Sequence, residues 1–183
     1  SSKSMNRTND FPMYHITFIN KQHLLSAFLI FFFSITIYSS TLKNNFVYDD
    51  DEIIVNNYFI RDTGNIPQLF QKEYFALSGE MSYRPIVTLT YFLDFALFGL
   101  LPFGFHLTNI ILHALNGILL YIFFTFIVQL SRSNDAFKSQ SIYTPLLATF
   151  LFVSHPGLTE AINAISFRED ILTLFFYMIT LNL

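Results

Sequence analysis

The sequence predicts an all-α membrane protein, a polytopic bundle of three or four transmembrane helices with one or two surface helices in its first outer loop. Three observations predict this fold class. Of the 183 residues, 52% are hydrophobic and 24 are Phe. Only 13% are charged, whereas soluble domains carry about 25%. Apolar runs also recur along the chain, and about 20 mostly apolar residues let a helix cross a bilayer.

Two apolar segments are long enough to cross on their own, residues 22–42 and residues 105–130. A signal peptide is the alternative interpretation of the first segment, because Lys21 precedes its apolar run and small residues follow. Two further runs, 143–154 and 171–183, are too short to cross alone at about 1.5 Å per residue. Because the last run reaches the end of the sequence, we expect the chain to be the N-terminal portion of a longer protein.

Residues 86–101 form an apolar run that we expect to lie at the membrane surface or against other helices. Pro85 suits the first turn of a helix, and Gly99 with Pro102 ends it. Asp94 lies inside the run, and a charge at the middle of a bilayer is costly. If this helix did cross, the later topology would invert.

Charge counts predict the orientation of the chain. Segment 1–21 has three basic residues and one acidic residue, and segment 131–141 has two and one. Segment 43–84 has four basic and seven acidic residues, and segment 157–170 has one and three. Basic loops stay cytoplasmic. We therefore expect residues 1–21 to be a cytoplasmic tail, and both acidic segments to face the periplasm, lumen or exterior.

Composition also excludes some classes of function. The net charge of −3 provides no basic face for nucleic acid. The chain has no Cys, so a disulfide framework, a thiolate metal site and a cysteine nucleophile are excluded.

Four acidic residues follow the first predicted span, in the order Asp49, Asp50, Asp51 and Glu52. The ordinary interpretation is a solvated loop. Adjacent carboxylates repel one another, however, so burial of one raises its pKa, and such a group can act as a general base. Asp50, Asp51 and Glu52 are also candidate oxygen ligands for a divalent cation, Mg²⁺ or Mn²⁺.

A second polar cluster, "SHPGLTEAINAISFRED", occupies residues 154–170 and contains His155, Glu160, Arg168 and Asp170. The apolar run before it is short, so His155 should lie near membrane depth, where polar groups pair or line a cavity. Arg168 is a candidate phosphate ligand, because a guanidinium can donate two parallel hydrogen bonds. An ordinary interfacial loop is the alternative.

Two other features lie on the predicted helices. Arg84, in "SYRP", begins the surface helix; it is either a snorkelling arginine or a second phosphate contact. A polar stripe follows one face of the second span, and we expect it to pack against other helices or to line a polar cavity. The seven-residue spacing of its two histidines differs from the four-residue spacing of zinc-binding helices. The stripe consists of His106, Asn109, His113 and Asn116.

Three stretches in this order, "FVYDD", "YRPIVTLTYFLDFALFGLLPFGFHLTNIILHALNGILLY" and "HPGLTEAINAISFREDIL", resemble the N-terminal part of the GT-C membrane glycosyltransferases. The resemblance covers roughly residues 22–183, which we take as one GT-C-like membrane domain. It is closest to the transmembrane O-mannosyltransferase-like proteins, in which tetratricopeptide repeats follow the membrane domain. It implies transfer of mannose or another hexose from a polyprenyl phosphate to a hydroxyl of protein Ser or Thr, or of a glycan, on the non-cytoplasmic face.

The resemblance also implies roles for single residues. Asp49 and Asp50 match the catalytic acid pair, which acts as general base toward the acceptor hydroxyl. Arg168, followed by Asp170, matches the place where the family meets the lipid phosphate. The sequence "HP" at His155 and the carboxylate of Glu160 match the pattern as well.

GT-C proteins have more spans than this chain, which leaves two other functions open. One is a non-catalytic GT-C-like subunit that assembles with a larger membrane complex. The other is a transporter or ion-handling protein, which would place its acidic residues at mid-bilayer. The partners that the sequence predicts are therefore membrane lipid, a polyprenyl-phosphate sugar and an acceptor protein or membrane complex.

Overall fold

The computed structural model describes residues 21–72, 74–78, 82–131 and 143–183, and within these ranges it contains helices and irregular segments but no strand. The all-α class is therefore confirmed. Of the predicted cytoplasmic tail, all but Lys21 lies outside the described residues, and so does nearly all of the basic loop 131–141.

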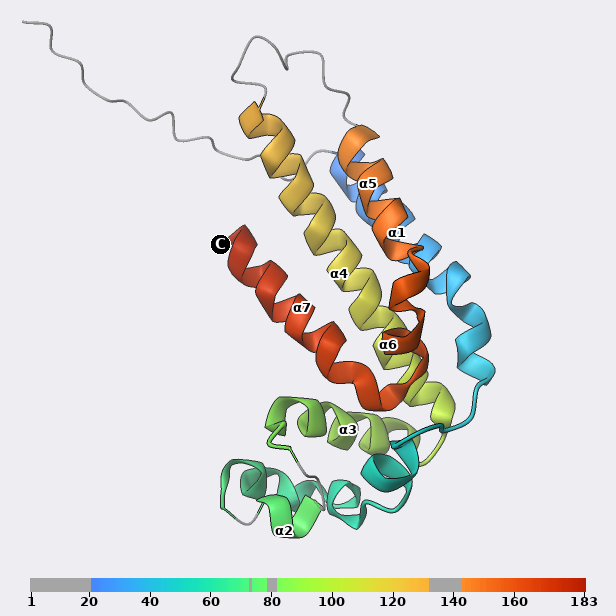
Figure 1. Ribbon diagram of the computed structural model, residues 1–183, viewed down its shortest axis with the longest axis vertical. Coiled ribbons are helices and arrows are strands. Elements are labelled where there is room, and N and C mark those ends of the chain that lie inside the picture. Colours follow the sequence, from blue (N-terminus) through green and yellow to red (C-terminus); the bar gives the residue numbers. More distant parts are fainter. Residues whose placement is uncertain (1–20, 73, 79–81, 132–142) are drawn as a thin grey trace, which may run out of the picture.

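Four helices run along the long axis of the molecule (Figure 1). They are α1 (Lys21–Ile37), α4 (Pro102–Ser131), α5 (Tyr143–Val153) and α7 (Arg168–Asn182). The central one, α4, packs against the other three. Among the described helices, only α4 is long and apolar enough to cross a membrane, over Pro102–Leu130. The other three have 17, 11 and 15 residues, so the polytopic arrangement stays a prediction.

The first predicted span, 22–42, is not one continuous α-helix. Helix α1 ends at Ile37, and the 3-10 helix η1 continues over Ser39–Lys43. The change falls in the sequence "YSST", where Ser and Thr hydroxyls compete with the backbone for hydrogen bonds. The hydroxyl of Ser39 donates to the carbonyl of Thr36 at 2.8 Å, which is a contact of this kind.

Short helices and α3 form the lower end of the molecule (Figure 1). Helix α3 (Pro85–Phe98) begins with Pro85 and ends at Gly99, whose φ of 60° favours glycine. This matches the predicted helix over 86–101. Of its two predicted placements, packing against other helices agrees with the structure, because Asp94 is buried. The short helices are η2 (Asp51–Val55), η3 (Tyr58–Arg61), η4 (Thr63–Phe70) and α2 (Tyr74–Ser78).

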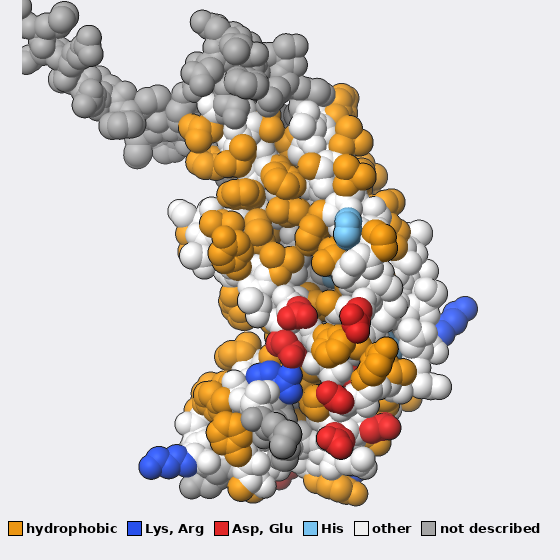
Figure 2. All heavy atoms as spheres, in the orientation of Figure 1, with side chains coloured by type: hydrophobic (Ala, Val, Ile, Leu, Met, Phe, Trp, Pro, Cys, Tyr) orange, Lys and Arg blue, Asp and Glu red, His pale blue; other side chains and the backbone are white. Residues whose placement is uncertain are grey.

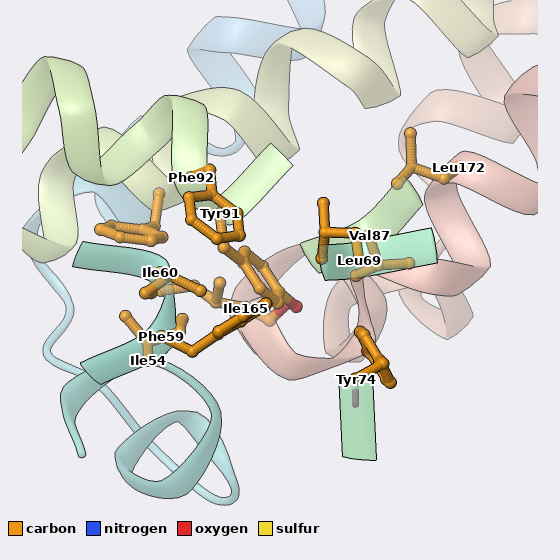
Figure 3. Packing of buried hydrophobic residues seen from close by; sticks show 11 residues of the cluster. Ile54, Phe59, Ile60, Leu69, Tyr74, Val87, Tyr91, Phe92, Ile165 and Leu172 are labelled. Carbon is orange, nitrogen blue, oxygen red and sulfur yellow. The ribbon is translucent and has the colours of Figure 1, made fainter. Parts of the chain in front are cut away.

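A hydrophobic core joins this lower end to the start of α7. Side chains from η2 to η4 meet those of α3 there, and Ile165 and Leu172 reach the same cluster from the C-terminal part of the chain (Figure 3). Tyr91, in the middle of the cluster, also donates a hydrogen bond to the carbonyl of Ile165 at 3.0 Å. Burial of these aromatic and aliphatic groups fixes α3 and the first loop against the residues that precede α7.

The chain between α5 and α7 is broken into η6 (Pro156–Leu158), α6 (Thr159–Asn163) and η7 (Ile165–Phe167). Such breaks leave backbone carbonyls without helical partners, and the polar stripe of α4 supplies donors. The side-chain amide of Asn109 donates to the carbonyl of Ile162 at 3.3 Å.

Two further members of the stripe bond to the helices on either side of this broken segment. His113 Nε2 donates to the carbonyl of Val153, at the end of α5, at 3.2 Å. Asn116 Nδ2 donates to the carbonyl of Ile171, in the first turn of α7, at 2.9 Å. The stripe therefore packs against other helices, the first of its two predicted roles.

Candidate functional site

The two predicted acidic segments meet at the lower end of the bundle. The carboxylate of Asp50 accepts a hydrogen bond from the backbone N–H of Ser166, at 2.8 Å. Arg84 and Glu169 form an ion pair with a nitrogen–oxygen distance of 2.8 Å. These contacts bring 43–84 and 157–170 into one junction, which we call the outer junction after the orientation predicted from the sequence. Figure 2 shows acidic side chains gathered on this lower half, below a mainly apolar upper half.

Asp50 is fully buried, and both of its carboxylate oxygens accept hydrogen bonds. The second bond comes from the backbone N–H of Val47, at 3.0 Å. Hydrogen bonds to a charged acceptor are stronger than neutral ones. Asp50 therefore ties the loop after α1 to η7, across the outer junction, and its oxygens face protein donors instead of solvent.

Asp49 has the opposite environment, because its side chain is exposed. The residue before it, Tyr48, has a φ of 54°. A non-glycine residue in this left-handed region costs on the order of 1–3 kcal/mol, and such strain occurs mostly at functional sites. The turn at Tyr48 precedes two neighbouring aspartates, of which one faces solvent and the other is enclosed.

Asp51 and Glu52 begin η2 and are both exposed. Among the residues that the structure describes, no group of three or more His, Cys, Asp or Glu side chains is placed to hold a metal ion. The candidate cation ligands Asp50, Asp51 and Glu52 thus do not form a preassembled cluster, since Asp50 already accepts hydrogen bonds from Val47 and Ser166.

Arg168 lies between the junction residues Ser166 and Glu169 in the sequence and is fully buried, and each of its three guanidinium nitrogens has a hydrogen-bond partner. Its Nε donates to the side-chain oxygen of Asn109 at 2.7 Å. Its Nη1 donates to the hydroxyl of Thr90 at 2.8 Å, and its Nη2 donates to the carbonyl of Phe105 at 2.9 Å. The guanidinium carbon also lies 4.7 Å from the centre of the Tyr91 ring, within cation–π range.

The charge of Arg168 is balanced by Asp94 of α3. Asp94 Oδ2 lies 2.6 Å from Arg168 Nη1, and the hydroxyl of Thr108 donates to Asp94 Oδ1 at 2.6 Å. Burial raises the pKa of the Asp94 carboxyl, while Arg168 and Thr108 oppose that rise. We call Arg168, Asp94 and their hydrogen-bond partners the buried network. It joins α3, α4 and the first residue of α7.

This pairing was not predicted from the sequence, although the charge of Asp94 inside an apolar run was evident. That charge was the available signal. A buried carboxylate needs a partner of opposite charge, and the two acidic segments that form the outer junction contain few cations. Which cation pairs with it depends on the approach of α7 to α3, and a single sequence does not specify this approach.

The other predicted site residues lie at the rim of the outer junction or beyond it. The side chain of Arg84 is 23% exposed, and that of Glu169 is 33% exposed. His155, Glu160 and Asp170 are exposed. The Nδ1 of His155 accepts the N–H of Gly157 at 3.1 Å and so caps η6. His155 itself is exposed, and the polar groups that pair with the backbone around it, Asn109 and His113, come from the stripe of α4.

Fold and site together define a class: within the described residues, the chain is helical without strands, has one membrane-crossing candidate and carries a charged junction at one end of its bundle. No family profile matches the chain, and no solved structure matches it. Curated proteins do match. The chain is 30% identical over 167 residues to the protein O-mannosyl-transferase F38B6.6 of Caenorhabditis elegans. The aligned region covers 88% of this chain and 23% of that protein.

Further matches have the same description. The chain is 30% identical to protein O-mannosyl-transferase TMTC4 of Mus musculus, over 81% of this chain and 21% of that protein. It is 29% identical to TMTC2 of Mus musculus, over 80% of this chain and 17% of that protein. The predicted resemblance is confirmed: TMTC-type protein O-mannosyl-transferases are homologues of this chain, which spans less than a quarter of the length of these relatives.

Proposed function

We propose that this chain is the catalytic end of a membrane glycosyltransferase that moves mannose from a polyprenyl phosphate to a hydroxyl of an acceptor protein on the non-cytoplasmic face. The observation that carries the proposal is the outer junction, where an exposed carboxylate and a partly exposed guanidinium occur in a homologue of protein O-mannosyl-transferases. The name of those relatives, protein O-mannosyl-transferase, supports mannose as the sugar and protein as the acceptor.

The proposal includes a multi-pass bundle with its N-terminus in the cytoplasm. Helix α4 is the crossing candidate, and lipid contact would account for the apolar side chains that α1, α5 and α7 expose. Soluble monomers rarely expose large contiguous apolar patches, and Figure 2 shows apolar side chains over much of the upper half of the molecule. The side chains that the three helices expose include Leu24, Leu25, Phe28 and Phe32 of α1, Leu147 and Leu151 of α5, and Phe176 of α7.

Asp49 is the proposed general base. A base must come within hydrogen-bond reach of the acceptor hydroxyl, and the Asp49 side chain is exposed. Asp50 would have to release Val47 and Ser166 first. In the proposed step, Asp49 takes the hydroxyl proton while the hydroxyl oxygen forms a bond to C1 of the sugar. The bond from C1 to the phosphate oxygen breaks, and the polyprenyl phosphate leaves with the electron pair.

Arg84 is the proposed contact for the leaving phosphate. Its ion pair with Glu169 lies at the rim, so a phosphate can compete for it. Arg168, which the family resemblance favours for this role, would have to leave Asp94 and three hydrogen bonds. We propose that Arg168 positions the start of α7 and that His155, Glu160 and Asp170 border the acceptor side.

The experiment compares neighbouring carboxylates in the full-length protein. Mannosyl transfer from a polyprenyl-phosphate mannose is measured in membranes for Asp49→Asn and for Asp51→Asn, which are matched in charge and exposure. We expect Asp49→Asn to lose transfer by about 10²-fold or more, the size of a general-base contribution, and Asp51→Asn to keep most of it. Full transfer by Asp49→Asn would contradict the assignment.

A non-catalytic subunit is the second candidate, and one observation favours it. Two of the charged groups that the family resemblance singles out, Asp50 and Arg168, are enclosed by protein contacts. On this alternative, neither Asp49→Asn nor Arg84→Gln changes transfer in membranes, and the full-length protein co-purifies with a larger complex that carries the activity.

A further inference from the structure

Two aromatic side chains stack beside the proposed base. The rings of Tyr48 and Phe167 have centroids 6.3 Å apart and are inclined by 26°, so they are nearly parallel. Tyr48 is 71% exposed, which leaves much of its surface open to solvent. One ring comes from the loop after α1 and the other from η7, so the pair spans the outer junction.

The contacts of Asp50 explain why the two rings meet. Asp50 holds the backbone N–H of Val47, next to Tyr48, and that of Ser166, next to Phe167. The left-handed backbone of Tyr48 adds a conformation that a tyrosine rarely adopts without a constraint. The aromatic pair is therefore built by the same carboxylate that closes the junction, and Asp49 follows it directly in the sequence.

Two other exposed tyrosines, Tyr58 and Tyr177, do not share these features. Tyr58 is 73% exposed, but the guanidinium of Arg61 lies over its ring at 4.2 Å. Tyr177 is 60% exposed on α7, a regular helix. Tyrosine at a membrane interface is common as a lipid anchor, and an anchor requires neither a left-handed backbone nor a stacked partner from a distant segment.

We propose that Tyr48 and Phe167 form a sugar-binding platform that takes the hexopyranose ring of the donor. An aromatic ring carries negative charge on its face, which suits the weakly positive C–H groups on one face of a pyranose. The exposed carboxylate of Asp49, the next residue in the sequence, can accept hydrogen bonds from sugar hydroxyls, and mixed aromatic and polar lining is typical of small-molecule sites. This inference rests on the proposed glycosyl transfer and names the sugar subsite of the same junction.

The absence of Trp from the chain allows a direct test. Tyr48→Trp introduces a single fluorescent reporter into the 183-residue chain, reconstituted in phosphatidylcholine nanodiscs and titrated with methyl α-mannopyranoside. We expect a saturable change in emission. The matched control is Tyr58→Trp, of similar exposure, which should not respond. Adding Phe167→Ala to Tyr48→Trp should weaken the apparent affinity roughly two- to twelve-fold, the value of one aromatic pair.

A second measurement uses the unaltered chain and does not depend on a variant that folds. Saturation-transfer NMR should show transfer from aromatic protons to the ring protons of methyl α-mannopyranoside, and Phe167→Ala should reduce it. An absence of transfer, or an equal response to myo-inositol, would overturn the platform. So would emission from the Tyr48→Trp variant that responds to lipid composition but not to the sugar, which would identify an interfacial anchor.

The outcomes separate the platform from the enzyme. Sugar binding that persists in Asp49→Asn, with transfer lost, supports both proposals. Sugar binding with full transfer by Asp49→Asn supports the platform and contradicts the proposed base. Transfer that depends on Asp49, with no sugar response at Tyr48, overturns the platform alone.

Discussion

The buried network and the rim of the outer junction contain the same chemical groups in opposite environments. Arg168 is fully buried with Asp94 and three hydrogen-bond acceptors, whereas the ion pair of Arg84 with Glu169 is partly open to solvent. The aspartates repeat this contrast, with Asp50 enclosed and Asp49 exposed. The type of a residue in a motif is therefore not enough to assign that residue a role in the protein. The number of protein partners separates groups that hold the fold from groups that remain available to a substrate.

The largest expected effect is on stability, from removing the charge of Arg168. Arg168→Leu leaves Asp94 buried without its partner, and breaking a buried pair in this way costs about 3–5 kcal/mol. We expect a correspondingly lower free energy of unfolding in detergent, measured by circular dichroism during denaturation.

The double variant Arg168→Leu with Asp94→Leu is the control for this prediction. Replacing a buried ion pair by apolar groups is often neutral, so the double variant should recover part of the loss. If Arg168→Leu unfolds like the unaltered chain, Arg168 is not a structural residue and the contrast between the two regions fails.

A smaller effect is expected where the α4 stripe meets α7. Asn116→Leu removes the side-chain hydrogen bond to the carbonyl of Ile171, and a typical intramolecular hydrogen bond contributes about 0.5–1.5 kcal/mol to stability. The measurement is the same unfolding experiment, and Thr180→Val is the control because Thr180 is exposed at the far end of α7. Equal losses in the two variants would mean that the stripe is not a packing device.

The smallest expected effect on stability is at the rim. Arg84→Gln removes an ion pair that is partly exposed, and such pairs are worth about 0–1 kcal/mol. We expect the free energy of unfolding to change little, whereas the Michaelis constant for the polyprenyl-phosphate sugar should rise in the full-length protein. A loss of stability as large as that of Arg168→Leu would place Arg84 with the buried network.

The apolar runs and the proline and glycine residues at their ends predicted the helices that depend on local sequence. The expected span 105–130 is α4, and the expected runs 86–101 and 143–154 are α3 and α5 with boundaries shifted by a few residues. The polar stripe was predicted because its spacing places four residues on one helix face. These features need only neighbouring residues and the period of the helix.

Which charged residues of the junction are buried and which are exposed could not be predicted in the same way. It depends on Ser166 reaching Asp50, and on α7 bringing Arg168 to Asp94, which are contacts between distant segments. The left-handed backbone at Tyr48 is a second reason, because nothing in "FVYDD" marks that tyrosine as the residue where the chain turns. The sequence therefore left Asp49 and Asp50 equivalent, and packing distinguishes them.

The most direct test of this account measures the unfolding free energies of Asp49→Asn and Asp50→Asn side by side. The two substitutions are identical in chemistry and adjacent in sequence, so the comparison isolates environment. The side-chain amide of an asparagine at position 50 has one acceptor oxygen, whereas its NH₂ group would face one of the two backbone N–H donors that Asp50 now accepts. For Asp50→Asn we therefore predict a loss of about 1–3 kcal/mol in the free energy of unfolding. For Asp49→Asn we predict a change within about 0.5 kcal/mol. Equal losses, or a larger loss for Asp49→Asn, would contradict the account.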